Sequence, residues 1–144
     1  MTCTFFGHKD APDAIYPRLL EVVEELFLER NVDRFLVGTH GSFDSLSLTA
    51  LRELKKKYPL LVYGVVLAYM PDANNYQDFE TIFPEGIEVA PKRFAITYRN
   101  EWMVRASDVV VCYIDHSWGG ASQFVEMATK QGKEIINLAE YRKA

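Results

Sequence analysis

Short β-prone runs alternate with stretches of helical periodicity along this chain, and that order restricts the possible fold more than any other feature. We expect strands at residues 3–6, 34–37, 61–67, 108–114 and 134–138. We expect helices from residue 13 onward, around residues 46–54, and at about 94–106 and 121–131. Strands that alternate with helices favour an α/β fold with a parallel sheet and right-handed crossovers.

The length and composition fit one domain of this class. The chain has 144 residues, of which 49% are hydrophobic and 25% charged, which excludes a disordered or fibrous chain. We therefore predict a single Rossmann-like nucleotide-binding domain over residues 1–144, with a doubly wound, mostly parallel sheet of about five strands and helices on both faces. Cys3 and Cys112 are too few for a disulfide scaffold or a zinc ribbon, and we expect both to be buried.

The charge balance and the apolar runs limit the possible partners. Lys plus Arg number 16 and Asp plus Glu number 20, so the net charge is -4 and no basic footprint for a nucleic acid is present. The longest apolar run, residues 60–70, is about half as long as the roughly 20 residues of a membrane-spanning helix. The N-terminus lacks the features of a signal peptide. We expect a cytoplasmic protein with no membrane partner.

Local signals predict where some elements begin and end. Asp13 is expected to be the N-cap of the first helix, with Pro17 in the first turn, where a proline costs no intrahelical hydrogen bond. Gly132 is expected at the C′ position of the helix ending near residue 131. Residues 70–86 have no useful periodicity and are expected to form a long loop, a kind of segment that is often functional.

Ligands of doubly wound sheets bind outside the carboxyl ends of the strands, where the strand order reverses. This rule selects the loops at residues 7–12, 38–44 and 115–121. All three histidines, His8, His40 and His116, lie just after predicted strands. We favour phosphate or ribose contacts for them over a metal site, because zinc ligands need a convergent geometry that spacing cannot show.

The first two loops offer donors for an anion. Gly7, His8 and Lys9 could contact a phosphate, although Gly7 could equally make a turn and Lys9 could be a solvated charge. The second loop leads directly into a helix, whose free N–H groups and dipole could also hold a phosphate. Its candidate residues are Gly38, Thr39, His40, Gly41 and Asp44, and Asp44 alone has the simpler interpretation of a cap or first-turn acid.

The third loop is the stronger signal, because a glycine pair lies between the clearest strand and a helix. Backbone amides there can surround an anion, although a tight strand-to-helix turn would explain the glycines as well. The candidate ligand-binding residues of this region are Asp115, His116, Ser117, Gly119, Gly120, Ala121, Ser122 and Gln123. Glu126 could reach back to a sugar bound at the helix start, or could be a surface acid.

Several motifs resemble those of one superfamily. Residues 99–108 with Arg99 and a Ser-Asp pair, the Gly119-Gly120 pair, and Glu126 six residues after Gly120 resemble the Lonely guy family. The opening residues 3–9 with Phe-Gly-His-Lys, and the Arg-Asn-x-x-Met-Val string from Arg99, resemble more closely the YpsA-like branch of the same superfamily. This superfamily, called SLOG, also includes the DNA-processing protein DprA.

The resemblance implies an activity and roles for two residues. Lonely guy enzymes hydrolyse the N-glycosidic bond of nucleoside 5′-monophosphates, releasing the base and ribose 5-phosphate. By this resemblance Arg99 would orient the sugar or the attacking water, and Glu126 would bind ribose hydroxyls or stabilise an oxocarbenium-like centre. A guanidinium can clamp oxygens, and a carboxylate stabilises a nearby developing cation.

The chain also departs from the enzyme pattern. Asn100 stands where the enzymes have Lys. Trp118, Ser122 and Gln123 replace the Pro, Gly and Thr of the phosphate-binding motif. Ser122 and Gln123 can still donate hydrogen bonds, and Trp118 could stack on a base or pack against the protein.

Two functional hypotheses follow. The first is the binding, with or without a sensing role, of a nucleotide or nucleotide-derived small molecule. The alternative is a Lonely guy-like phosphoribohydrolase that uses Arg99 and Glu126. The acidic charge disfavours a DprA-like binder of single-stranded DNA, although a local basic patch could be hidden in the average. No G-x-G-x-x-G motif follows the first strand, so we set aside a redox or NAD-dependent enzyme. We expect no cofactor. A homo-oligomer could form through the helix that carries Trp102.

Overall fold

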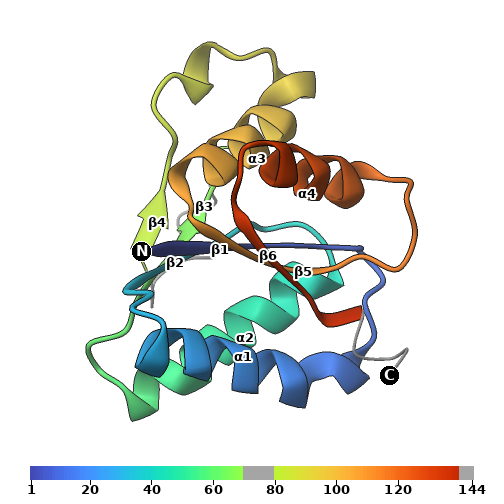
Figure 1. Ribbon diagram of the computed structural model, residues 1–144. Helices are drawn as coiled ribbons and strands as arrows, with labels where there is room; N and C mark the ends of the chain where they lie inside the picture. Colours follow the sequence, from blue (N-terminus) through green and yellow to red (C-terminus); the bar gives the residue numbers. More distant parts are fainter. Residues whose placement is uncertain (70–79, 140–144) are drawn as a thin grey trace.

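The computed structural model describes residues 1–69 and 80–139, which form a sheet between two layers of helices (Figure 1). The sheet has six strands, all parallel, in the order β4-β3-β2-β1-β5-β6. Its strands are β1 (Thr2–Gly7), β2 (Arg34–Val37), β3 (Val62–Val66), β4 (Glu80–Ile82), β5 (Val109–Tyr113) and β6 (Glu134–Asn137). The expected doubly wound, Rossmann-like α/β architecture is therefore confirmed.

Two pairs of α-helices cover the two faces of the sheet. The helices are α1 (Tyr16–Glu29), α2 (Ser42–Lys57), α3 (Ala95–Ala106) and α4 (Gly120–Lys130). Helices α1 and α2 lie on one face, and α3 and α4 lie on the other (Figure 1). The described residues also form three short 3-10 turns, at Asp13–Ile15, Ile87–Val89 and Lys92–Phe94.

The central strands have an apolar core on each side. In β5, Val111 faces the core formed with α1 and α2, while Cys112 faces the core formed with α3 and α4. Burial on both faces explains why this strand is a continuous apolar run rather than an alternating one. Cys3 and Cys112 lie in different cores, and both are buried free thiols.

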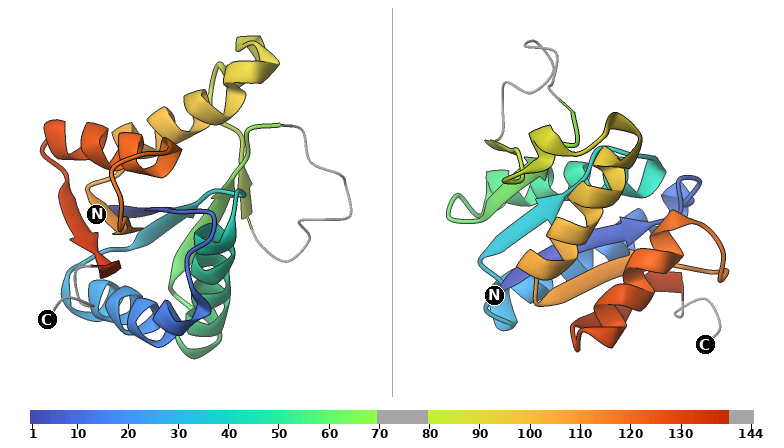
Figure 2. Two further views of the ribbon diagram at one scale, coloured as in Figure 1. Left: turned by 90° about the vertical axis from the view of Figure 1, so that its right-hand side faces the viewer. Right: turned by 90° about the horizontal axis from the view of Figure 1, so that it is seen from above.

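The strand order reverses beside β1. The chain adds β2, β3 and β4 on one side of β1 and then crosses to place β5 and β6 on the other. Strand β1 pairs with β5 as far as Gly7 and Tyr113, and the His8 amide beyond this pair still donates to the Tyr113 carbonyl oxygen. Figure 2 (left) looks onto this carboxyl edge of the sheet.

The strand β4 corrects the expectation of a loop over residues 70–86 and of about five strands. It pairs with β3, with Gly64 opposite Glu80 and Val66 opposite Ile82. This edge strand has only three residues, and Glu80 and Thr81 are exposed, so it has neither the length nor the apolar content that reveals a strand in a sequence. Residues 70–79 of the expected loop lie outside the described residues.

The prediction that Asp13 caps the first helix is wrong. Asp13 begins a 3-10 turn after Pro12, in which the Ile15 amide donates to the Pro12 carbonyl oxygen. Helix α1 then begins at Tyr16 without a side-chain cap, and Pro17 lies in its first turn as expected. Gly132 follows α4 with a φ of 78°, which confirms the expected C′ glycine. No helix in the described part of the chain is long and apolar enough to cross a membrane.

We predict that Gly7→Ala destabilises the fold. A Cβ at Gly7 would lie 2.2 Å from Cγ of Phe43, a fully buried ring. Overpacking of this kind costs about 1–3 kcal/mol in the free energy of unfolding, which urea denaturation measures. Gly120→Ala is the matched control, because no atom lies within 4 Å of its added Cβ. Equal stability of the two variants would contradict this packing role for Gly7.

Candidate functional site

A cavity of about 610 Å³ lies at the carboxyl edge of the sheet, where the strand order reverses. Residues from the loops after β1, β2 and β5 line it together with the facing turns of α3 and α4. Among the predicted site residues, the lining includes Gly7, His8, Lys9, His40, Asp44, Arg99, Asn100, His116, Gly119, Gly120, Ala121 and Gln123. The structure thus brings residues from all three selected loops to one space.

The other predicted residues lie outside the lining of this cavity. They are Gly38, Thr39, Gly41, Asp115, Ser117, Ser122 and Glu126. Thr39 and Asp115 make hydrogen bonds with residues of the lining. Glu126 is 67% exposed, and its Oε1 lies 3.2 Å from Nζ of Lys130. The structure therefore does not bring Glu126 together with Arg99.

Arg99 is buried in the cavity wall although it is charged. Its Nε donates to Oδ1 of Asn100 at 2.9 Å, and its Nη1 donates to Oγ1 of Thr39 at 3.0 Å and to the Val66 carbonyl oxygen at 3.2 Å. These bonds connect α3 to the loop after β2 and to the end of β3. The guanidinium is thereby held in a fixed position against the cavity.

Sequence reasoning missed the apolar floor of the cavity. The lining also contains Phe6, Ile96, Met103 and Phe124. On α3, Ile96 and Met103 flank Arg99 at helical spacing, three residues before it and four after it, so one face of the helix carries all three. The apolar residues at this spacing on both sides of Arg99 were the sequence signal that could have identified the cavity-facing side of α3.

Asp44 lies beside Arg99 in the first turn of α2. Its Oδ2 accepts a hydrogen bond from the His40 amide at 2.8 Å. A Cβ at Gly38 would lie 2.9 Å from this oxygen and 3.3 Å from Cζ of Arg99, so the glycine makes room for both groups. Burial raises the pKa of Asp44 to about 6, although the His40 hydrogen bond and the Arg99 charge oppose the rise.

The start of α2 is largely committed to bonds within the protein. The Ser42 amide donates to the Lys9 carbonyl oxygen at 2.8 Å, and the Ser42 hydroxyl donates to the Ala11 carbonyl oxygen at 2.7 Å. Gly41 has a φ of 93°, and a Cβ there would lie 2.7 Å from Cα of Lys9. These contacts fix the loops after β1 and β2 to each other and leave fewer amides at α2 for an anion.

The start of α4 is open by contrast. Gly119 is the N-cap residue, with a φ of 100°, and no side chain caps the helix. No atom lies within 4 Å of a Cβ added to Gly119 or to Gly120. The first amides of α4 have no acceptor four residues earlier within the helix, and the helix dipole is positive at this end. This end of α4 therefore suits a bound anion.

Three rings stack along one wall of the cavity. The His8 and His116 rings have centroids 3.5 Å apart with 12° between their planes. The His116 and Trp118 rings are 3.9 Å apart with 19° between their planes. His8 is buried, and its Nε2 accepts a hydrogen bond from the Asp115 amide at 3.2 Å. Burial and the neighbouring His116 lower the pKa of His8, while Asp115 partly opposes that shift.

The side chains of His8, Asp115 and His116 are close enough to resemble a metal site. Their candidate ligand atoms lie within 4.8 Å of one another, and His8 Nε2 is 3.4 Å from Oδ1 of Asp115. A metal ion must lie near the plane of each imidazole ligand, but these two rings are stacked almost parallel. The lone pair on His8 Nε2 is also used by the Asp115 amide. Metal binding would therefore require the stack to open.

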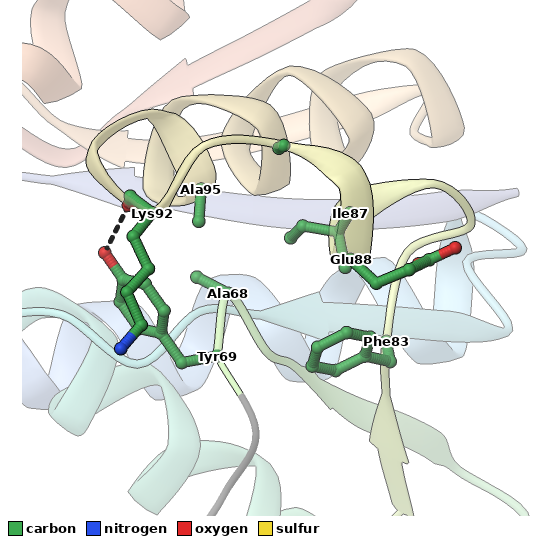
Figure 3. Close-up of a pocket in the computed structure, with 8 residues that line it drawn as sticks. Ala68, Tyr69, Phe83, Ile87, Glu88, Lys92 and Ala95 are labelled. Atoms are coloured by element: carbon green, nitrogen blue, oxygen red, sulfur yellow. Dashed lines mark hydrogen bonds between the residues drawn. The ribbon is translucent and has the colours of Figure 1, made fainter.

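A second cavity, of about 550 Å³, lies between the end of β3 and the start of α3 (Figure 3). Tyr69 and Lys92 line it on one side, and Phe83, Ile87 and Glu88 on the other. The Tyr69 hydroxyl donates to the Lys92 carbonyl oxygen at 3.0 Å. None of the candidate ligand-binding or catalytic residues lines this cavity, although Phe83 belongs to the expected loop over residues 70–86.

Comparison with known proteins supports the fold assignment. The structure is similar to the X-ray structure of DNA processing protein A (DprA) from Streptococcus pneumoniae, with a TM-score of 0.65 and 14% sequence identity. The match covers 94% of this chain and 49% of that chain, so this chain spans about half the length of that protein. No family model and no curated protein matches the sequence.

These findings define the class of protein as a Rossmann-like α/β domain whose fold resembles that of DprA. At 14% sequence identity this likeness shows the fold alone. The finer expectation, a YpsA-like protein, has no matching family model.

The raised pKa of Asp44 predicts a pH-dependent contribution to stability. An unfolded Asp has a pKa of about 3.9, so the folded protein holds this proton more tightly. The bound proton on Asp44 therefore stabilises the folded protein fully below about pH 4, and this stabilisation is lost as the pH rises through about 6. Compared with Asp44→Asn, the wild type should lose free energy of unfolding across this window in urea denaturation. A constant difference between the two proteins would contradict the raised pKa.

Proposed function

We propose that this domain binds a nucleotide or a nucleotide-derived small molecule in the cavity at the carboxyl edge of the sheet. One observation carries the proposal: the open N-terminus of α4, the buried Arg99 and the neighbouring half-buried Asp44 border the same cavity of about 610 Å³. This volume lies within the range of small-molecule sites, which combine apolar walls with a few positioned polar groups.

The two polar regions of the cavity suit different parts of such a ligand. The amides at Gly119–Gly120 and the dipole of α4 favour a phosphate group. Asn100 and Asp44 border the cavity beside the Arg99 guanidinium, and an amide next to a carboxylate suits the hydroxyl groups of a sugar. The apolar side chains in the lining lower the local dielectric and would strengthen polar contacts with a bound ligand.

The position of Glu126 favours binding over hydrolysis. Under the hydrolase alternative its carboxylate must reach the sugar, yet this side chain is 67% exposed and paired with Lys130. The name of DprA refers to DNA processing, but the net charge of -4 of this chain opposes a DNA partner. Binding of a small anionic ligand without hydrolysis requires neither Glu126 in the cavity nor an extended basic surface.

We predict that Gly120→Val weakens the binding of ribose 5-phosphate and of adenosine 5′-monophosphate by about ten-fold or more. The larger side chain occupies the open approach to the α4 amides, and the loss of charge-assisted hydrogen bonds costs about 1.5–3 kcal/mol. Isothermal titration calorimetry measures both affinities. Thr129→Ala, an exposed position on the same helix, is the control. Unchanged affinity in Gly120→Val would contradict a phosphate site at this end of α4.

A direct assay tests the hydrolase alternative. The protein is incubated with nucleoside 5′-monophosphates, and free base and ribose 5-phosphate are followed by mass spectrometry. The binding proposal predicts intact nucleotide after incubation, because Glu126 does not border the cavity. Release of base by the wild type but not by Glu126→Ala would establish the hydrolase instead.

A further inference from the structure

We infer that Trp118 is the stacking surface for a flat aromatic ring of the ligand, so that the ligand class is a phosphorylated compound carrying such a ring rather than a simple sugar phosphate. The inference rests on the proposed function and makes it more specific. It starts from the three stacked rings of His8, His116 and Trp118.

The stack is anchored at its inner end. The His8 amide donates to the Tyr113 carbonyl oxygen at 3.2 Å, and the His8 ring contacts the Tyr113 ring edge-on at 6.4 Å. The next ring is also held, because Nδ1 of His116 lies 3.0 Å from the Trp118 carbonyl oxygen. The two imidazoles therefore form a rigid support for the indole.

Trp118 is exposed at the outer end of this stack. Its side chain remains 70% exposed even though His116 covers one face of the indole, and it borders the cavity. Aromatic rings stack on indole faces with little dependence on their substituents. A ring placed on Trp118 would extend the stack by one member and would bury the largest exposed apolar surface of the cavity rim.

The position of Trp118 in the chain connects this surface to the proposed phosphate site. Trp118 directly precedes Gly119 and Gly120, whose backbone opens the start of α4. A ligand with a phosphate and a planar ring joined through a sugar can reach both features. A sugar phosphate alone can use only the amides, so the two ligand classes should differ in affinity.

Calorimetric titration of adenosine 5′-monophosphate and ribose 5-phosphate into the wild type, Trp118→Phe and Trp118→Ala tests the inference. Loss of one stacked base weakens binding by about 5- to 150-fold. Trp118→Ala should weaken adenosine 5′-monophosphate by this factor and leave ribose 5-phosphate unchanged, while Trp118→Phe should retain most of the affinity. Phe94→Ala is the control, because Phe94 is an exposed aromatic residue that lines neither cavity.

Fluorescence gives an independent reading of the same contact. The chain has two tryptophans, so Trp102→Phe leaves Trp118 as the single reporter. Adenosine 5′-monophosphate should quench this signal, and ribose 5-phosphate should not.

The outcomes separate the inference from the proposed function. Tight binding of both compounds with equal affinity, or equal weakening of both by Trp118→Ala, would overturn the stacking role and leave the phosphate site intact. Failure of both compounds to bind the wild type would overturn the proposed function and the stacking role together.

Discussion

The pairing of β1 with β5 is the constraint on which the rest of the structure depends. These strands are separated by about a hundred residues in the sequence, yet five residue pairs align them in parallel, from Cys3–Val109 to Gly7–Tyr113. This pairing requires the chain to cross from the β4 side of the sheet to the other side, which places α3 and α4 on the second face. The same crossing places the reversal of the strand order beside the cavity, which is lined by the loops after β1, β2 and β5 and by α3 and α4.

Much of the fold could be predicted because a parallel strand that is buried on both faces has a continuous apolar sequence. Residues 61–67 predicted β3 on this ground, and four of the five residues of β3 are buried. The edge strand β4 could not be predicted, because Glu80 and Thr81 are polar and exposed and the strand owes its existence to pairing with β3. The start of α1 depends similarly on the local conformation at Pro12 rather than on a capping side chain.

The candidate site was predictable as a set of loops but not as a set of contacts. The strand-end rule selected His8 and His116 separately, whereas their stacking follows from side-chain packing that spacing cannot specify. Arg99 and Glu126 were selected by the same resemblance, yet the structure buries the first in the cavity wall and exposes the second to solvent. The hydrogen bond from the Ser42 amide to the Lys9 carbonyl oxygen could not be predicted either, because it joins two loops that are distant in the sequence.

The proposed ligand site is the cavity at the carboxyl edge of the sheet. Two-dimensional ¹H–¹⁵N NMR of the labelled protein during titration with adenosine 5′-monophosphate tests this location. We expect saturable shifts of the Gly119, Gly120 and Ala121 amides and of the Arg99 Nε–H signal, which report on both polar regions of the cavity. Shifts confined to the residues around the second cavity, or no shifts at saturating nucleotide, would contradict it.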